Sequence, residues 1–161
     1  MTGLLSSQEV EGLLMKQVVG RIGCHNKQEV YVVPISYAYD GQYIYCHCHE
    51  GKKLEMMRGN PAVCFQVDEM KDMANWKSVV VNGIFEELTN NTNKTKALKL
   101  LLERELPISS SVTTHLGDTW PFTATGSNEL VDVPGTVFRI SVKEKTGRFE
   151  NTSGTQFHML N

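Results

Sequence analysis

The dipeptide Asp40-Gly41 separates two runs of strand-forming residues, and it constrains the fold more than any other feature of the sequence. Residues 30–37 before it and residues 43–48 after it are rich in β-branched and aromatic side chains. An Asp-Gly pair favours the positive backbone angles of a tight hairpin turn. The sequence therefore predicts an antiparallel β-hairpin at this dipeptide.

Further strands are predicted on both sides of this hairpin, and the predicted helices are few and short. The expected strands cover residues 18–24, 30–37, 43–48, 62–67, 78–88 and 137–142. Apolar spacing predicts helices near residues 6–14, over 50–58 and over 94–103. Sequential strands joined by hairpin turns indicate a mainly β fold, a mostly antiparallel barrel with peripheral helices. An ordered loop or lid is expected over residues 107–129, which are rich in Ser and Thr.

The composition is that of an ordinary globular protein. A single domain over residues 1–161 is expected from the length. The net charge is −2 and no basic block occurs, so nucleic acid is not an expected partner. No apolar run approaches the ~20 residues that cross a bilayer, so no membrane partner is expected. The first residues carry no export signal, which predicts a cytoplasmic protein whose four cysteines are reduced.

Two lysines open the predicted helix 50–58, where the sequence reads Gly51-Lys52-Lys53. Cations in a first turn oppose the helix dipole, so their presence there needs a reason. The lysines are either simply exposed to solvent or part of an anion site, where backbone N–H and ammonium groups converge on a phosphate. Gly51 favours the anion site, because a residue without Cβ lets a ligand approach the backbone.

The run Cys46-His47-Cys48-His49 has the composition of a metal site but not the geometry. Alternate residues of a strand point to opposite faces, so the four side chains cannot converge on one ion. No metal is therefore predicted, and the two cysteines are interpreted as small buried hydrophobes. For His47, packing and contact with a ligand both remain open.

Other strand residues also allow a structural or a functional interpretation. Arg21 is either a solvated arginine at a strand edge or part of a site. Gly83 marks either a β-bulge or a backbone that lies against a flat ligand. Pro34 lacks a ladder donor, which predicts an edge or bulge there and frees backbone groups of Ile35 and Ser36 for a ligand.

The order of these motifs along the chain resembles the pyridoxamine 5′-phosphate oxidase-like family of FMN-binding split barrels. Within that family the chain most resembles the branch of nitroimidazole-resistance (5-nitroimidazole reductase-like) proteins. The motifs that carry the resemblance are Val19-Gly20-Arg21-Ile22-Gly23, then Tyr31-Val32-Val33-Pro34-Ile35-Ser36-Tyr37 with Asp40-Gly41, then Ile44-Tyr45-x-His47 with Gly51-x-Lys53, then Asn60-Pro61-x-Val63-Cys64-Phe65, then Ser78-Val79-Val80-Val81-x-Gly83.

The resemblance implies a six-stranded antiparallel split β-barrel that forms a homodimer with FMN at the subunit interface. The cofactor-binding residues that it implies are Arg21, Pro34, Ile35, Ser36, His47, Gly51, Lys52, Lys53, Ser78, Val79 and Val80. His47 is also the candidate catalytic residue, as a group that positions substrate or donates a proton.

The implied activity is that of an oxidoreductase that reduces a small molecule, with NAD(P)H as a candidate electron donor. A flavin- or haem-binding protein without turnover remains the alternative. Oxidation of vitamin B6 is not expected, because the Arg-x-His pattern of authentic pyridoxamine 5′-phosphate oxidases is absent near the C-terminus.

Overall fold

The structure is a computed structural model that describes residues 1–104 and 133–152, so the loop predicted over 107–129 lies outside the described residues. The helices and strands are β1 (Thr2–Leu4), α1 (Ser7–Lys16), β2 (Val19–His25), β3 (Val30–Tyr39), β4 (Tyr43–Cys48), α2 (Lys52–Gly59), β5 (Ala62–Asp72), β6 (Asn75–Glu87), α3 (Asn91–Glu103) and β7 (Thr136–Glu150).

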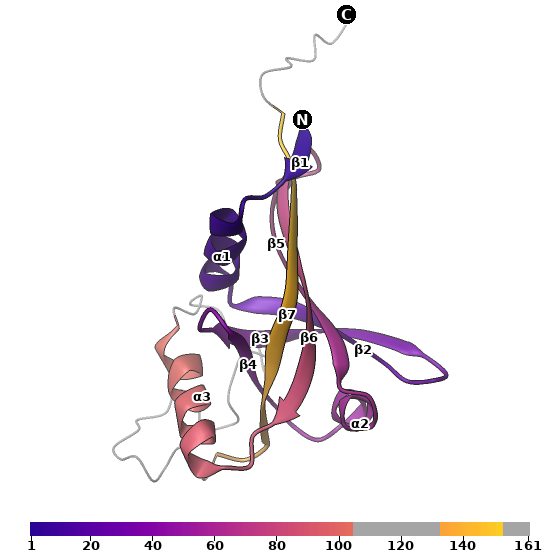
Figure 1. The fold of residues 1–161 in the computed structure, drawn as a ribbon, viewed down its shortest axis with the longest axis vertical. Helices are drawn as coiled ribbons and strands as arrows, with labels where there is room; N and C mark the ends of the chain where they lie inside the picture. Colours follow the sequence, from indigo (N-terminus) through magenta and orange to yellow (C-terminus); the bar gives the residue numbers. More distant parts are fainter. Residues whose placement is uncertain (105–132, 153–161) are drawn as a thin grey trace, which may run out of the picture.

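The strands form one antiparallel sheet that closes on itself (Figure 1). The strand order is β1-β7-β4-β3-β2-β5-β6, and a further pairing of β6 with β7 makes a ring of six strands. The mainly β, six-stranded split barrel is therefore confirmed. The short strand β1 was not predicted, because three residues that pair only with the end of β7 carry no periodic signal.

Four strands are longer than the sequence predicts, β3 by only two residues, since it ends at Tyr39. β5 continues to Asp72, β6 begins at Asn75, and β7 continues to Glu150. In Figure 1 the last three strands rise beyond the barrel as a narrow blade, with α1 beside it. The last residues of β5 are exposed or half-buried, so they lack the apolar alternation that reveals a strand in sequence.

Apolar side chains gather in two clusters, one inside the barrel and one outside it. The inner cluster includes Ile44, Cys46 and Cys48 of β4, and α2 adds Leu54 and Met57 to it. The outer cluster lies under α3 and includes Ala38, Tyr45, Leu98, Leu101 and Val137. The alternation predicted along β4 is confirmed, since its cysteines and tyrosines lie in different clusters. All four cysteines of the chain lie outside any disulfide in this structure.

The bulge interpretation of Gly83 is also confirmed. Asn82 pairs with Glu144 but Gly83 pairs with Val142, so β7 carries an extra residue at this point. The backbones approach closely here. A Cβ added to Gly83 would lie 2.6 Å from the carbonyl oxygen of Ser141.

We predict opposite effects for two glycine-to-alanine substitutions. Gly83→Ala should lower the free energy of unfolding by ~1–3 kcal/mol, because the two strands must move apart. Gly12→Ala should raise it by ~0.5–1 kcal/mol, because Gly12 lies in α1 and nothing lies within 4 Å of an added Cβ. Urea unfolding measures both. A Gly83→Ala protein as stable as the wild type would contradict the close approach.

Candidate functional site

The barrel is split between β3 and β4. These strands pair only from Tyr37 and Cys46 to Tyr39 and Ile44, whereas β3 pairs with β2 from Ser36 down to Val30. In the part of the chain that the structure describes, no strand pairs with the other edge of β3 over residues 30–36. We call this stretch the open edge of β3.

The backbone of Pro34 and Ser36 faces this open edge. The N–H of Tyr37 donates to the Val18 oxygen at 3.0 Å, so it points toward β2. Neighbouring residues of a strand point their backbone groups in opposite directions, which turns Ser36 and Pro34 toward the open edge and Ile35 toward β2. The N–H that Pro34 lacks would have faced this unpaired edge, so its absence removes no hydrogen bond from the sheet, as expected for a proline in a strand.

Ser36 also has a side chain without a partner. It is 7% exposed, and its hydroxyl has no hydrogen-bond partner among residues 1–104 and 133–152. A buried hydroxyl without a hydrogen bond costs roughly 1–3 kcal/mol, so such groups in folded proteins generally find a partner. A polar ligand atom at the open edge would supply one.

The first turn of α2 has the features of an anion site. Gly51 is the N-cap residue, and no side chain caps the helix. Its carbonyl accepts from the N–H groups of Leu54 and Glu55, which leaves the preceding N–H groups for another acceptor. A side chain added at Gly51 would meet nothing within 4 Å, so the space beside the turn is open.

The two lysines of this turn differ in their surroundings. Lys52 Nζ lies 2.8 Å from the Glu29 carboxylate and 4.9 Å from the centroid of the Tyr31 ring. The hydrogen bond to Glu29 raises the pKa of Lys52. Lys53 is half-buried, and within the described ranges no carboxylate forms a salt bridge with it. Lys52 therefore links the turn to the start of β3, and Lys53 is the cation available to an anion.

His47 lies on the outer face of β4 and contacts the segment that leads into β7. Its Nε2 is 2.6 Å from the carbonyl oxygen of Pro134. A carbonyl only accepts, so Nε2 carries a hydrogen and Nδ1 of the neutral ring is an acceptor. Burial lowers the pKa of His47 although the Pro134 contact raises it, which favours the neutral ring.

Several other predicted residues form a row across the outer face of the sheet. Arg21 pairs with Pro34 on one side and with Gln66 on the other, and Gln66 pairs with Val80. Arg21 Nη1 also lies 3.2 Å from the Asp68 carboxylate. The row joins the open edge, because Pro34 belongs to both.

The remaining predicted residues contribute differently. Ser78 accepts a hydrogen bond from Gln66 Nε2 at 3.0 Å, so it lies beside that row. Ile35 and Val79 point into the barrel core. Their backbones face paired strands, β2 for Ile35 and both β5 and β7 for Val79, so the expectation of free backbone groups at Ile35 is wrong. The structure thus places these residues in two groups. One is the turn at Gly51 with the open edge of β3, and the other is the outer-face row.

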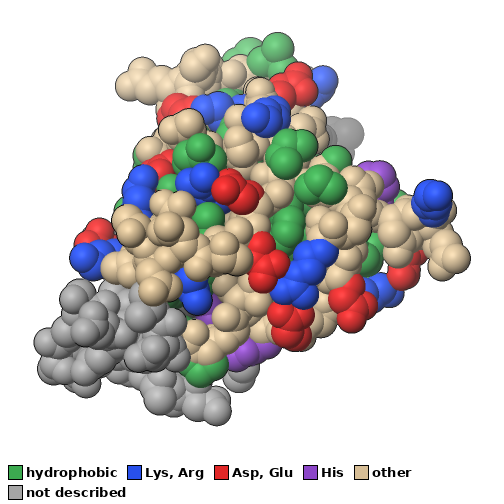
Figure 2. Space-filling model, turned by 60° about the horizontal axis from the view of Figure 1, so that its bottom comes forward, with side chains coloured by type: hydrophobic (Ala, Val, Ile, Leu, Met, Phe, Trp, Pro, Cys, Tyr) green, Lys and Arg blue, Asp and Glu red, His purple; other side chains and the backbone are tan. Residues whose placement is uncertain are grey.

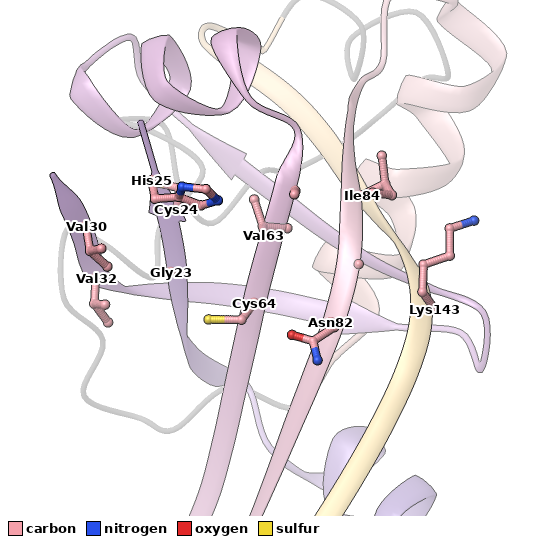
Figure 3. A pocket seen from close by; sticks show the side chains of 12 residues that line it. Gly23, Cys24, His25, Val30, Val32, Val63, Cys64, Asn82, Ile84 and Lys143 are labelled. Atoms are coloured by element: carbon pink, nitrogen blue, oxygen red, sulfur yellow. The ribbon is translucent and has the colours of Figure 1, made fainter. Parts of the chain in front are cut away.

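A cavity of about 490 Å³ on the same outer face was not predicted (Figure 3). Its walls come from five strands, β2, β3, β5, β6 and β7. Val30 and Val32 are 77% and 59% exposed, and Ile84 is 39% exposed. A large exposed apolar surface of this kind marks a site for a ligand or a partner. The sequence carries no local signal for it, because the walls meet only through strand register.

The rest of the described surface gives little sign of other ligand classes. Figure 2 shows basic and acidic side chains interspersed over the visible face, with no field of one sign. No three His, Cys, Asp or Glu side chains are arranged for a metal ion within residues 1–104 and 133–152. None of the helices in these ranges has the length and apolarity needed to cross a membrane.

The fold and the site define a class, that of split β-barrels with an anion-binding turn beside an unpaired strand edge. A family model described as pyridoxamine 5′-phosphate oxidase matches residues 6–149, and the chain belongs to this family.

Solved structures of similar proteins cover nearly the whole chain. A FAD-binding protein from Mesorhizobium loti is 32% identical with a TM-score of 0.71, over 94% of this chain and 99% of that one. A candidate pyridoxamine 5′-phosphate oxidase from Corynebacterium glutamicum is 25% identical with a TM-score of 0.67, over 94% and 99%. A candidate 5-nitroimidazole antibiotic resistance protein from Bacteroides thetaiotaomicron is 20% identical with a TM-score of 0.67, over 92% and 87%. The nitroimidazole branch is thus one of several structural neighbours.

The chain also matches the uncharacterized protein RA0666 from Rhizobium meliloti (strain 1021). The two are 38% identical over 85 residues. The match spans 53% of this chain and 56% of that protein, so it covers about half of each.

We predict a pH-dependent stability difference between the wild type and His47→Gln. The pKa of His47 is lowered in the folded protein from an ordinary value of 6.5, so the folded state binds fewer protons than the unfolded state. His47 therefore destabilises the protein increasingly as the pH falls below that value, and has no such effect well above it. Gln retains an N–H for the Pro134 carbonyl and does not titrate. As the pH is lowered from about 8 to about 5, the free energy of unfolding of the variant, measured in urea, should rise relative to that of the wild type. A constant difference would contradict the half-buried neutral ring.

Proposed function

We propose that the protein is an FMN-binding flavoprotein, and that it acts as an oxidoreductase on a small molecule. The observation that carries this proposal is the unpartnered Ser36 hydroxyl at the open edge of β3, beside an uncapped helix N-terminus with a lysine available. A flat, polar ring with a phosphate on a flexible chain suits these two features together. Family membership and the Mesorhizobium loti neighbour, which is named FAD-binding, support it.

Each residue group would have its own task. The N–H groups after Gly51 and the Lys53 ammonium would hold the phosphate. The backbone of Pro34 and Ser36 at the open edge would bind the polar rim of the ring. Arg21 and Val80 would contact the part that extends over the outer face. The bound flavin would supply the electron transfer, and the protein would orient it and exclude water.

The FMN phosphate is also present in FAD, so the same turn suits either cofactor. We propose FMN because all of the implied contacts are made to the flavin ring and the first phosphate. Extraction of the cofactor from purified protein and measurement of its mass distinguishes FMN from FAD and from haem.

Turnover is tested separately from binding. NAD(P)H should bleach the flavin absorbance under anaerobic conditions, and a nitroaromatic or another small oxidant should restore it. A flavin that stays oxidised with NAD(P)H, dithionite being the positive control for reduction, would instead favour a flavin-binding protein without this activity.

The phosphate site predicts unequal roles for the two lysines. Lys53→Ala should weaken FMN binding about ten- to over a hundredfold, since a charge-assisted contact contributes ~1.5–3 kcal/mol. Lys52→Ala is the matched control, and its smaller effect follows from the pairing of Lys52 with Glu29. Flavin fluorescence measures the affinities. Riboflavin, which has no phosphate, should bind the wild type much more weakly than FMN. Unchanged FMN affinity in Lys53→Ala would show that the phosphate does not bind at this turn.

We also propose a homodimer in which the second copy covers the apolar outer face around Val30 and Val32. An obligate-type interface of order 2,000 Å² or more is expected for such an assembly. Light scattering of the wild type at micromolar concentration should report a dimer. Val32→Lys should shift it toward the monomer, because a lysine ammonium would have to be buried. A stable wild-type monomer that retains its flavin would exclude a site that needs the subunit boundary.

A further inference from the structure

Glu50 is the residue directly before Gly51, at the turn where the proposed phosphate binds. A free carboxylate at this position would repel a bound phosphate, because both groups are negative. The carboxylate is not free. Arg58 Nη1 lies 2.8 Å from one Glu50 oxygen, and Arg58 Nη2 lies 2.9 Å from the other. A two-point contact of this kind fixes the orientation of the carboxylate and offsets part of its charge.

Arg58 is itself held from the other side. Its Nε and Nη2 lie 2.8 Å and 2.9 Å from the two oxygens of Glu87, which is the last residue of β6. The hydroxyl of Thr136, the first residue of β7, donates to Glu50 at 3.2 Å. The residue before the turn is therefore tied to the last turn of α2, to β6 and to β7.

These contacts are largely exposed, so water screens them, although a bidentate network also helps to hold the fold. The Arg58 side chain is 39% exposed and that of Glu50 is 65% exposed. Exposed ion pairs contribute little to the free energy of unfolding, because water screens them. The affinity for an anion bound at Gly51 would depend more strongly on Arg58, because that anion lies beside the carboxylate whose charge Arg58 partly offsets. The lowered pKa of Glu50, caused mainly by Arg58, means that this carboxylate is ionised at neutral pH.

We propose that Arg58 is a positioning residue for the cofactor phosphate, because it offsets part of the Glu50 charge and holds the Glu50 carboxylate against Arg58 and Thr136. The inference rests on the proposed FMN function and adds to it a residue that does not itself touch the flavin.

The experiment compares the affinities of FMN and riboflavin, since only FMN carries the charge that Glu50 would repel. In Arg58→Met the Kd of FMN should rise about five- to thirtyfold, and the Kd of riboflavin should change by less than about twofold. The double variant Glu50→Gln with Arg58→Met also removes the carboxylate next to the turn, and leaves only Glu87, at the end of β6, without its partner. It should recover FMN affinity to within about threefold of the wild type.

Arg139→Met is the matched control. Arg139 pairs with Glu86, the neighbour of Glu87, at 2.7 Å, and covers the Tyr43 ring at 4.0 Å, but it has no contact with the turn among the interactions of the described residues. Its loss should leave both affinities unchanged. Thermal unfolding of every variant checks that the fold is retained.

The outcomes separate this inference from the proposed function. Equal losses for FMN and riboflavin in Arg58→Met, or no recovery in the double variant, would mean that Arg58 acts only through the fold. Wild-type FMN affinity in Arg58→Met, while Lys53→Ala loses FMN, would overturn the role of Arg58 and leave the phosphate site standing. A wild type that binds neither flavin would instead overturn the proposed function.

Discussion

The early end of the ladder between β3 and β4 determines most of what this molecule can bind. The ladder stops at Tyr37 and Cys46, while β3 continues to pair with β2 for the rest of its length. An unpaired edge with free backbone groups normally attracts another strand. Pro34 removes one donor from this edge, and the contact of Lys52 with Glu29 and Tyr31 sets the first turn of α2 beside its start. The edge is therefore open to a small polar ligand and less suited to a strand.

Strand β3 serves two surfaces at once, since its backbone lines the open edge and its outward side chains line the outer face. Pro34 pairs with Arg21 in the outer-face row, and Val32 and Val30 continue into the cavity of about 490 Å³. A ligand at the edge and a partner on the face would thus contact the same strand. The two proposals together imply that a bound flavin and a second subunit stabilise the same strand. Loss of the flavin is therefore expected to weaken the dimer.

The sequence predicts those parts of the fold whose signals are local. The turn at Asp40-Gly41, the alternation along β4 and the turn at Gly51 are all recognisable within a few residues. The extension of β5 to Asp72 and of β7 to Glu150 could not be predicted. The last residues of β5 are exposed, and the inward positions at the end of β7 are Lys145, Gly147 and Phe149, so neither segment shows apolar alternation in sequence. Ser36 was predicted at the site from its place beside Pro34 and from the resemblance, but its unpartnered hydroxyl is seen only in the folded structure. Arg58 was missed for a similar reason, since Glu87 lies far from it in sequence.

The contact of His47 with Pro134 bears on the choice between proton donor and positioning group. Nε2 is committed to the Pro134 carbonyl, so only Nδ1 can face another group, and in the neutral ring Nδ1 accepts. Donation from Nδ1 would first require the ring to gain a proton against the burial that lowers its pKa. A neutral His47 is better suited to accept a hydrogen bond from an N–H group of a flavin or substrate and so to orient it. A proton consumed in the reaction would then come from solvent or from the substrate itself, and replacing His47 would affect binding geometry more than proton transfer.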